Sequence, residues 1–165
     1  MAPNDAVLAP FRKQGHDHGK CVRDALTAAE QVCAREGASL TPLRRRVLEL
    51  VWGAHAPVRA YDLLDTLRGE RRRAAPPTIY RALDFLLSVR LIHRIESLNA
   101  FVGCADPKHS HGGQFLICDG CGAVAELDDP TIARRVADRA RALGFTPRRQ
   151  TIEISGRCPD CAADG

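Results

Sequence analysis

Two Cys-x-x-Cys pairs in the last third of the chain have the residue types and spacing of a metal site: Cys118/Cys121 and Cys158/Cys161. Each pair directs two thiolates to one spot, and four thiolates make a closed tetrahedral zinc site. The first pair lies between two short apolar, strand-like segments, whereas a thioredoxin-like redox pair begins a helix. We therefore predict a structural zinc, with a redox pair or two disulfides as the alternatives. A closed site performs no reaction, so the function lies elsewhere.

Charge and cysteine content narrow the class of protein. Residues 1–103 carry 16 Lys and Arg against 11 Asp and Glu, whereas residues 104–165 carry 8 against 9. A basic first part and a cysteine-rich second part suggest two domains with different tasks. Seven cysteines without a secretion signal favour a reducing compartment with metal-bound thiolates. No apolar run reaches the length of a membrane span, so we expect a cytoplasmic protein.

Helix signals fill the residues before 90, and a hairpin signal follows them. Apolar residues recur at helical spacing, and Thr41-Pro42 has the pattern of a helix start. The expected helices span 20–36, 42–52, 60–68 and about 77–87, and the expected strands span 91–96 and 100–103. Helices followed by a two-stranded hairpin form a winged helix-turn-helix, in which the last helix before the hairpin enters the major groove of DNA.

The pattern predicts an α+β protein in four parts. These are a mobile tail (1–19), a winged-helix DNA-binding domain (20–103), a linker (104–112) and a zinc-stapled α/β dimerisation domain (113–165). The last part reads as strand, strand, helix and strand. A unit of roughly 50 residues buries too little apolar surface to be stable alone, so zinc and dimer formation are expected to stabilise it.

Four stretches of the chain carry specific residue patterns. They are Leu40-Thr41-Pro42-x-Arg44-x-x-Val47-Leu48, Ala60-Tyr61-Asp62-Leu63-Leu64, Pro76-Pro77-Thr78-Ile79-Tyr80-Arg81-Ala82-Leu83-Asp84-Phe85-Leu86 and Ile117-Cys118-Asp119-x-Cys121-Gly122. Together, over about residues 20–161, they resemble the ferric uptake regulator (Fur) family and its zinc uptake regulator branch. The resemblance implies a metal-dependent repressor that binds AT-rich inverted repeats of double-stranded DNA as a homodimer and shuts off zinc-uptake genes.

The resemblance also implies a second, regulatory zinc site, so that each protomer holds two zinc ions. Its ligands in this sequence are His93, Cys104, a linker histidine and Glu126. We favour His111 as the linker ligand over His109. One thiolate, two imidazoles and one carboxylate suit tetrahedral zinc. An iron(II)- or peroxide-sensing regulator of the same family is the alternative, but the histidine-rich run used for iron(II) is absent.

DNA contacts are implied by the same resemblance. The expected base contacts are Tyr61 and Arg81, because arginine reads guanine by paired hydrogen bonds in the major groove. Thr78, Tyr80 and Arg44 are the expected phosphate contacts. Arg45 and the run Arg71–Arg73 are further phosphate candidates, with a solvated loop as the alternative for the run.

Two other classes of protein compete with this interpretation. A zinc hydrolase needs an open coordination position for water, and four protein ligands at each predicted site leave none, so no catalytic residue is assigned. A zinc-stapled interaction module needs no recognition helix. The residues after Pro77 have the pattern of a recognition helix, which argues against such a module. Both alternatives are therefore less favoured than the repressor.

Overall fold

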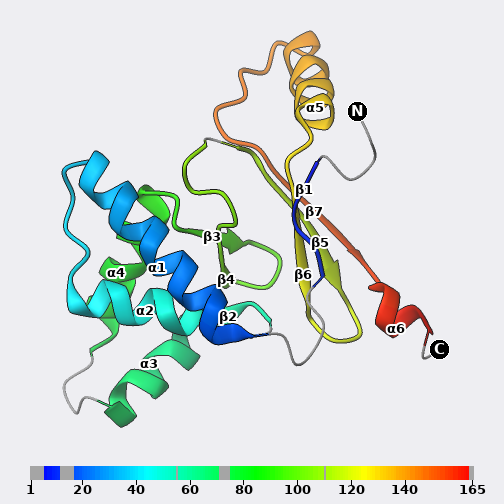
Figure 1. Ribbon diagram of the computed structural model, residues 1–165. Coiled ribbons are helices and arrows are strands. Elements are labelled where there is room, and N and C mark those ends of the chain that lie inside the picture. Colours follow the sequence, from blue (N-terminus) through cyan, green and yellow to red (C-terminus); the bar gives the residue numbers. More distant parts are fainter. Residues whose placement is uncertain (1–5, 12–16, 55, 71–74, 110, 164–165) are drawn as a thin grey trace. The chain divides into compact units, whose positions relative to one another are not determined.

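The computed structural model describes residues 6–11, 17–54, 56–70, 75–109 and 111–163. Its contacts divide the chain into two compact units (Figure 1). The first unit contains Lys13–His109, and the second unit combines Met1–Arg12 with Ser110–Gly165. Within the described residues, no helix has the length and apolarity needed to cross a membrane.

Helices dominate the described part of the unit that spans Lys13–His109. Its elements are α1 (His18–Arg35), α2 (Pro42–Trp52), β2 (Val58–Arg59), α3 (Ala60–Glu70), α4 (Pro76–Ser88), β3 (Ile92–Ile95) and β4 (Ala100–Gly103). The strands form an antiparallel sheet in the order β2-β4-β3. The sequence of α2, α3, α4 and the β3–β4 hairpin is the winged helix-turn-helix that the sequence predicts.

Local capping groups set the starts of the helices. The Asp17 carboxylate accepts a hydrogen bond from the backbone N–H of Lys20 (3.1 Å), which starts α1 two residues earlier than predicted. Thr41 caps α2 in the same way by accepting from the Arg44 N–H (3.4 Å), and Pro42 occupies the first helical position. These caps satisfy N–H groups that have no partner inside the helix.

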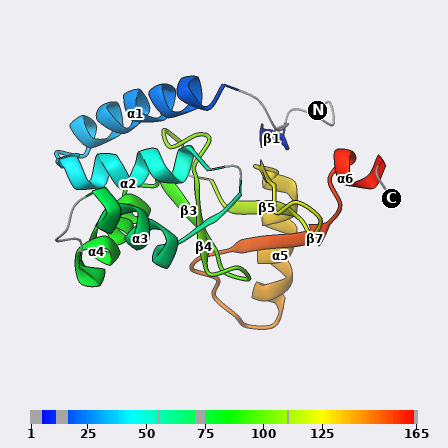
Figure 2. The ribbon, with the colours of Figure 1, turned by 90° about the horizontal axis from the view of Figure 1, so that it is seen from below.

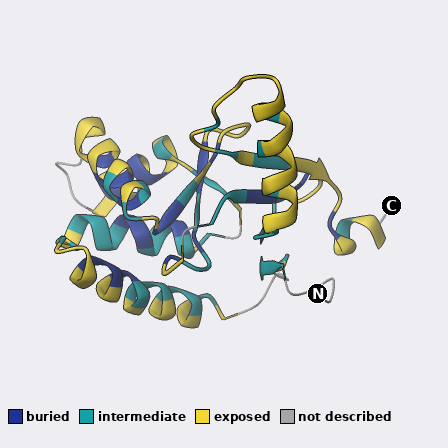
Figure 3. Cartoon of the chain, turned by 90° about the horizontal axis from the view of Figure 1, so that it is seen from above, coloured by how far each residue is buried: buried dark blue, intermediate teal, exposed yellow. Residues whose placement is uncertain are grey.

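One apolar core holds this unit together. The inward faces of α1, α2, α3 and α4 meet the hairpin, and the buried residues are the dark blue stretches of the cartoon (Figure 3). On α4 the buried residues are Ile79, Ala82, Leu83 and Leu86. Burying each large aliphatic side chain contributes about 1.5–3 kcal/mol. The core therefore fixes which face of α4 is turned away from the solvent.

The second unit is built on a mixed sheet. Its elements are β1 (Val7–Ala9), β5 (Gly113–Cys118), β6 (Val124–Leu127), α5 (Pro130–Ala142), β7 (Thr151–Gly156) and α6 (Pro159–Ala163). The strand order is β1-β6-β5-β7. β5 pairs antiparallel with β6 and parallel with β7. After β6 the chain passes through α5 before it returns to the sheet as β7 (Figure 2).

The first strand corrects the predicted tail. We expected residues 1–19 to be mobile, but Val7–Ala9 pair antiparallel with β6. The carbonyl of Ala6 also accepts a hydrogen bond from the backbone N–H of Asp128 (2.7 Å). An edge strand has unpaired backbone groups, and this short apolar segment satisfies those of β6. The prediction is wrong for these residues and for His18 and Gly19, which begin α1.

Candidate metal sites and DNA-contact residues

The four cysteines of the two Cys-x-x-Cys pairs meet at one end of the sheet of the second unit. Their sulfur atoms all lie within 4.8 Å of one another. The Sγ atoms of Cys121 and Cys158 are 3.8 Å apart. A zinc ion with four Zn–S bonds of about 2.3 Å has sulfurs about 3.8 Å apart, by tetrahedral geometry. The donor set and its spacing therefore fit a structural zinc.

Strand pairing brings the two cysteine pairs together. Cys118 ends β5 opposite Gly156 of the parallel strand β7, and two residues later Cys158 begins the turn into α6. Gly120 lies in the first loop, where a Cβ atom would come within 2.9 Å of the Cys161 sulfur. The loop therefore needs glycine at this position to close around the sulfurs.

Backbone N–H groups also prepare the sulfurs for a cation. The N–H of Cys158 donates to the Cys118 sulfur (3.3 Å), and this hydrogen bond is the first cause that lowers the pKa of the Cys118 thiol to about 6. Hydrogen bonds with the Cys121 and Cys158 side chains raise the pKa of Cys161 to about 12. Because zinc binds thiolates, metal binding at this cluster is expected to release the protons of thiols whose pKa is raised, such as Cys161.

Two of the predicted regulatory ligands lie together in the first unit. His93 of β3 pairs with Val102 of β4, and Cys104 follows two residues after Val102. Side chains alternate along a strand, so His93 and Cys104 share one face of the hairpin. Their ligand atoms lie within 4.8 Å of each other, and Cys104 is buried with 2% of its surface exposed. An imidazole and a thiolate at this separation suit zinc.

The other two predicted ligands meet in the second unit. The His111 Nε2 atom lies 2.7 Å from the Glu126 Oε1 atom, and their side chains are 2% and 4% exposed. His109 is 78% exposed and lies against the Asp106 carboxylate (2.7 Å). Thus His111 lies beside Glu126, whereas His109 belongs to the other unit and lies beside Asp106. Burying a carboxylate is costly unless a charged or hydrogen-bonding partner accompanies it, and His111 supplies one here.

Four of the predicted DNA contacts are on the solvent side of α3 and α4. Tyr61 is 66% and Tyr80 is 54% exposed, although tyrosine rings usually bury most of their apolar surface. Thr78 and Arg81 are exposed as well. Because the core fixes the buried face of α4, these side chains are available to a ligand outside the unit.

Arg44 has contacts within the fold that the sequence did not predict. Its guanidinium lies 3.5 Å from the centroid of the Phe85 ring and donates to the Ser39 carbonyl (2.6 Å). This half-buried arginine joins α2 to α4 by a cation–π contact, and its contact with phosphate stays a prediction. The adjacent Arg45 forms an ion pair with Glu30. The run Arg71–Arg73 lies outside the described residues.

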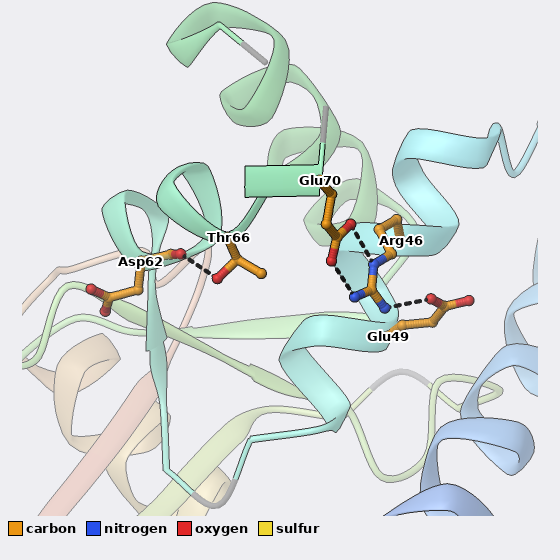
Figure 4. Close-up of polar contacts among 5 residues, drawn as sticks. All are labelled: Arg46, Glu49, Asp62, Thr66 and Glu70. Atoms are coloured by element: carbon orange, nitrogen blue, oxygen red, sulfur yellow. Dashed lines mark hydrogen bonds and ion pairs between the residues drawn. The ribbon is translucent and has the colours of Figure 1, made fainter. Parts of the chain in front are cut away.

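The sequence did not reveal an ion-pair network between the two helices before α4. Arg46 donates from Nε to Glu70 Oε2 (3.0 Å), from Nη2 to Glu70 Oε1 (2.5 Å) and from Nη1 to Glu49 Oε2 (2.9 Å), as Figure 4 shows. Paired hydrogen bonds between arginine and a carboxylate fix direction as well as distance. The network therefore holds the C-terminal end of α3 against α2. Only the Glu49 partner, one helical turn away, could be recognised from spacing.

The combination of a winged helix-turn-helix with a small thiolate-rich unit defines a class of transcription regulator. The sequence profile described as "Ferric uptake regulator family" matches residues 35–155. The chain belongs to the ferric uptake regulator family and is, as a member, a transcription regulator.

Within this family, the similarity is to zinc uptake regulators. The chain is 40% identical to the zinc uptake regulation protein of Escherichia coli (strain K12) over 140 residues, 84% of this chain and 82% of that protein. A solved structure of a zinc uptake regulator complexed with zinc and DNA is 39% identical, with a TM-score of 0.82 over 87% of this chain and 96% of the other. The crystal structure of holo XcZur is 45% identical, with a TM-score of 0.79 over 86% and 99%.

Proposed function

We propose that this protein is a zinc-responsive repressor that binds AT-rich inverted repeats of DNA as a zinc-loaded homodimer and shuts off zinc-uptake genes. The observation that carries the proposal is the division of one ligand set between the units. His93 and Cys104 lie together in one unit, and His111 and Glu126 lie together in the other. The similarity to a regulator solved with zinc and DNA supports the choice of ligand and partner.

The switch follows from this division of ligands. A bound zinc supplies coordinate bonds that tie the two pairs to each other. Residues 20–103, which carry the recognition helix, and residues 113–165 are then held in one arrangement. If DNA prefers that arrangement, zinc and DNA raise each other's affinity. The thiolate and imidazole ligands must lose their protons before zinc binds. The response of DNA binding to zinc is therefore expected to weaken at acidic pH.

The proposal assigns two zinc ions to each protomer. One is structural and binds the four cysteines, and the other is regulatory and binds His93, Cys104, His111 and Glu126. Four protein ligands at each site leave no position for a reacting water, so the protein is proposed not to be an enzyme. The thiolate Cys104 favours zinc over iron(II), which prefers nitrogen and oxygen ligands in this family. Free thiolates require a reducing compartment, and we assign the protein to the cytoplasm.

Helix α5 supports the homodimer. It has no buried residue, and it appears yellow and teal along its whole length in Figure 3. Large apolar side chains of the second unit are exposed on α5, on the residues after it and on β7: Ile132, Val136, Leu143, Phe145 and Ile154. An amphipathic helix needs an apolar surface to cover such side chains. A second copy of the same unit supplies that surface in our proposal.

The substitution Val136→Asp is expected to convert the dimer into a monomer. Val136 is 48% exposed in the single chain, and a carboxylate buried there in each protomer is desolvated without a partner. Sedimentation velocity at micromolar concentration measures the change. The matched control is Arg135→Asp on the same helix, which changes an exposed side chain and is expected to leave the dimer intact. A Val136→Asp protein that stays dimeric would exclude α5 from the interface.

The exposed residues of α3 and α4 are proposed to read the operator. Arg81 and Tyr61 contact bases, and Thr78 and Tyr80 contact phosphates. The structure gives Arg44 partners within the fold, so we propose that it holds α4 in position as well as contacting phosphate. Its effect on DNA binding would then be partly indirect.

Replacing Arg81 by alanine is expected to weaken specific DNA binding by about 1–3 kcal/mol and to relax the sequence choice at one position. A guanine that loses a bidentate arginine is distinguished less well from other bases. Fluorescence anisotropy with the operator and with base-substituted duplexes measures both effects. Arg35→Ala on α1, where the side chain is 52% exposed, removes the same charge far from α4 in sequence and serves as the control. Unchanged specificity would remove Arg81 as a base contact.

The function as a whole is tested by selecting duplexes from a randomised pool at low and high buffered free zinc, with anaerobic iron(II) alongside. Enrichment of an AT-rich inverted repeat only at high zinc is the expected result. Enrichment with iron(II) alone would support the DNA-binding assignment and refute zinc as the sensed metal. Enrichment without metal, or none, would refute the switch.

A further inference from the structure

The single tryptophan of the chain lies against the last residue of the wing. Trp52 ends α2, and Gly103 ends β4. A Cβ atom on Gly103 would lie 2.1 Å from Cε2, 2.3 Å from Nε1 and 2.7 Å from Cδ2 of the Trp52 indole. Non-bonded carbon atoms approach to only about 3.5 Å. The indole therefore occupies the space that any side chain at position 103 would need.

This contact is on the face of the hairpin opposite the metal ligands. Gly103 pairs with Ile92, and Val102 pairs with His93. Because successive residues point to opposite faces, His93 and Cys104 share one face, whereas Ile92 and the vacant side of Gly103 share the other. Trp52 thus packs against the backbone of Gly103, the residue before Cys104, on the face opposite the metal ligands.

Cys104 is at the end of the hairpin ladder and needs such support. Its N–H donates to the Leu91 carbonyl (3.1 Å), and the chain then leaves the strand. Strand ends open more readily than strand centres. A metal ligand, however, has to be held within about 0.5 Å of its bonding position.

We propose that Trp52 is the positioning residue of the regulatory zinc site. The indole, seated on Gly103, fixes the end of β4 and thereby directs the Cys104 thiolate to the same point as the His93 imidazole. This inference rests on the proposed function, because it takes His93 and Cys104 as zinc ligands. Trp52 belongs to α2, and α2 is joined to α4 through Arg44 and Phe85, so the ligand pair and the recognition helix share one packed unit.

Cobalt(II) binding to the full-length dimer tests the proposal, because thiolate ligation gives cobalt a charge-transfer absorption band. With the four-cysteine site kept filled by zinc, cobalt is titrated into the regulatory site of the parent, Trp52→Leu, Trp52→Phe, Gly103→Ala and the Trp52→Leu/Gly103→Ala double variant. Each single change is expected to weaken cobalt binding, Trp52→Leu and Gly103→Ala by about 10–100-fold. The double variant is expected to bind more tightly than Gly103→Ala alone, because leucine leaves room for the new Cβ.

Controls separate positioning from general destabilisation. Val32→Ala creates a cavity at a residue of α1 that is 2% exposed, and it is expected to lower the melting temperature without weakening cobalt binding. Parent-like affinity in both Trp52 variants, or no rescue in the double variant, would overturn the positioning role. Cys104→Ser in the same titration tests the site itself. If its thiolate band persists, the proposed ligand set is wrong, whatever the Trp52 variants do.

Discussion

Replacing Cys118 by serine is expected to unfold the second unit, release one zinc per chain and dissociate the dimer. Cys118 is buried at the end of β5, and its sulfur accepts the backbone N–H of Cys158, 40 residues later. The site therefore holds the end of β5 to the turn that begins α6. In small zinc-bound units, metal binding contributes about 10–16 kcal/mol, comparable to the whole stability of an ordinary domain of about 5–15 kcal/mol.

The first unit is expected to survive this change. All residues of its main core lie between Ala29 and Phe101, so its helices do not depend on the thiolates. Metal analysis, circular dichroism and sedimentation velocity on one preparation measure zinc content, helix content and mass. Cys21→Ser on α1 is the matched control, because that half-buried cysteine is outside both candidate sites. A Cys118→Ser protein that remains a dimer with full zinc content would contradict the four-cysteine site.

Replacing Cys104 by serine is expected to abolish the response to zinc while leaving the fold and the dimer intact. The change removes the only thiolate of the proposed regulatory set and leaves a hydroxyl of nearly the same size, which is a poor zinc ligand at neutral pH. The hydrogen bond from the Cys104 N–H to the Leu91 carbonyl joins backbone groups, so the substitution keeps it.

The measurement is operator affinity at low and high buffered free zinc. In the parent protein the affinity is expected to rise with zinc, and in Cys104→Ser the ratio of the two affinities is expected to fall to about one. The zinc content of the four-cysteine site is expected to stay at one per chain in both proteins, which separates this result from loss of the structural site. A ratio like that of the parent would show that the sensing site is elsewhere.

Elements with local signals were predicted well from the sequence. The cap at Thr41 and the apolar spacing of the helices are properties of a few neighbouring residues, and α2 begins where those signals indicate. The Cys-x-x-Cys spacing likewise predicted which four sulfurs meet. Residue types and spacings over a few neighbouring positions are sufficient to predict these features.

Features that depend on distant partners were missed. The strand β1 has three residues, and only pairing with β6 stabilises it. The sequence also does not show that the Arg44 guanidinium lies over the ring of Phe85 on α4. The pairing of His111 with Glu126 was not missed, but it was favoured from the resemblance, because spacing alone does not show how β5 and β6 pair. In each case the deciding contact is a tertiary one.

The strand β1 also affects how the protein folds during synthesis. Val7 pairs with Leu127, so β1 has no strand partner until the chain has been synthesised as far as β6. The winged-helix unit, whose partners are closer in sequence, can fold in that interval. Contacts between distant residues slow folding, because a long loop must be closed before they form. The sheet of the second unit is therefore expected to be completed last, after β7 has left the ribosome.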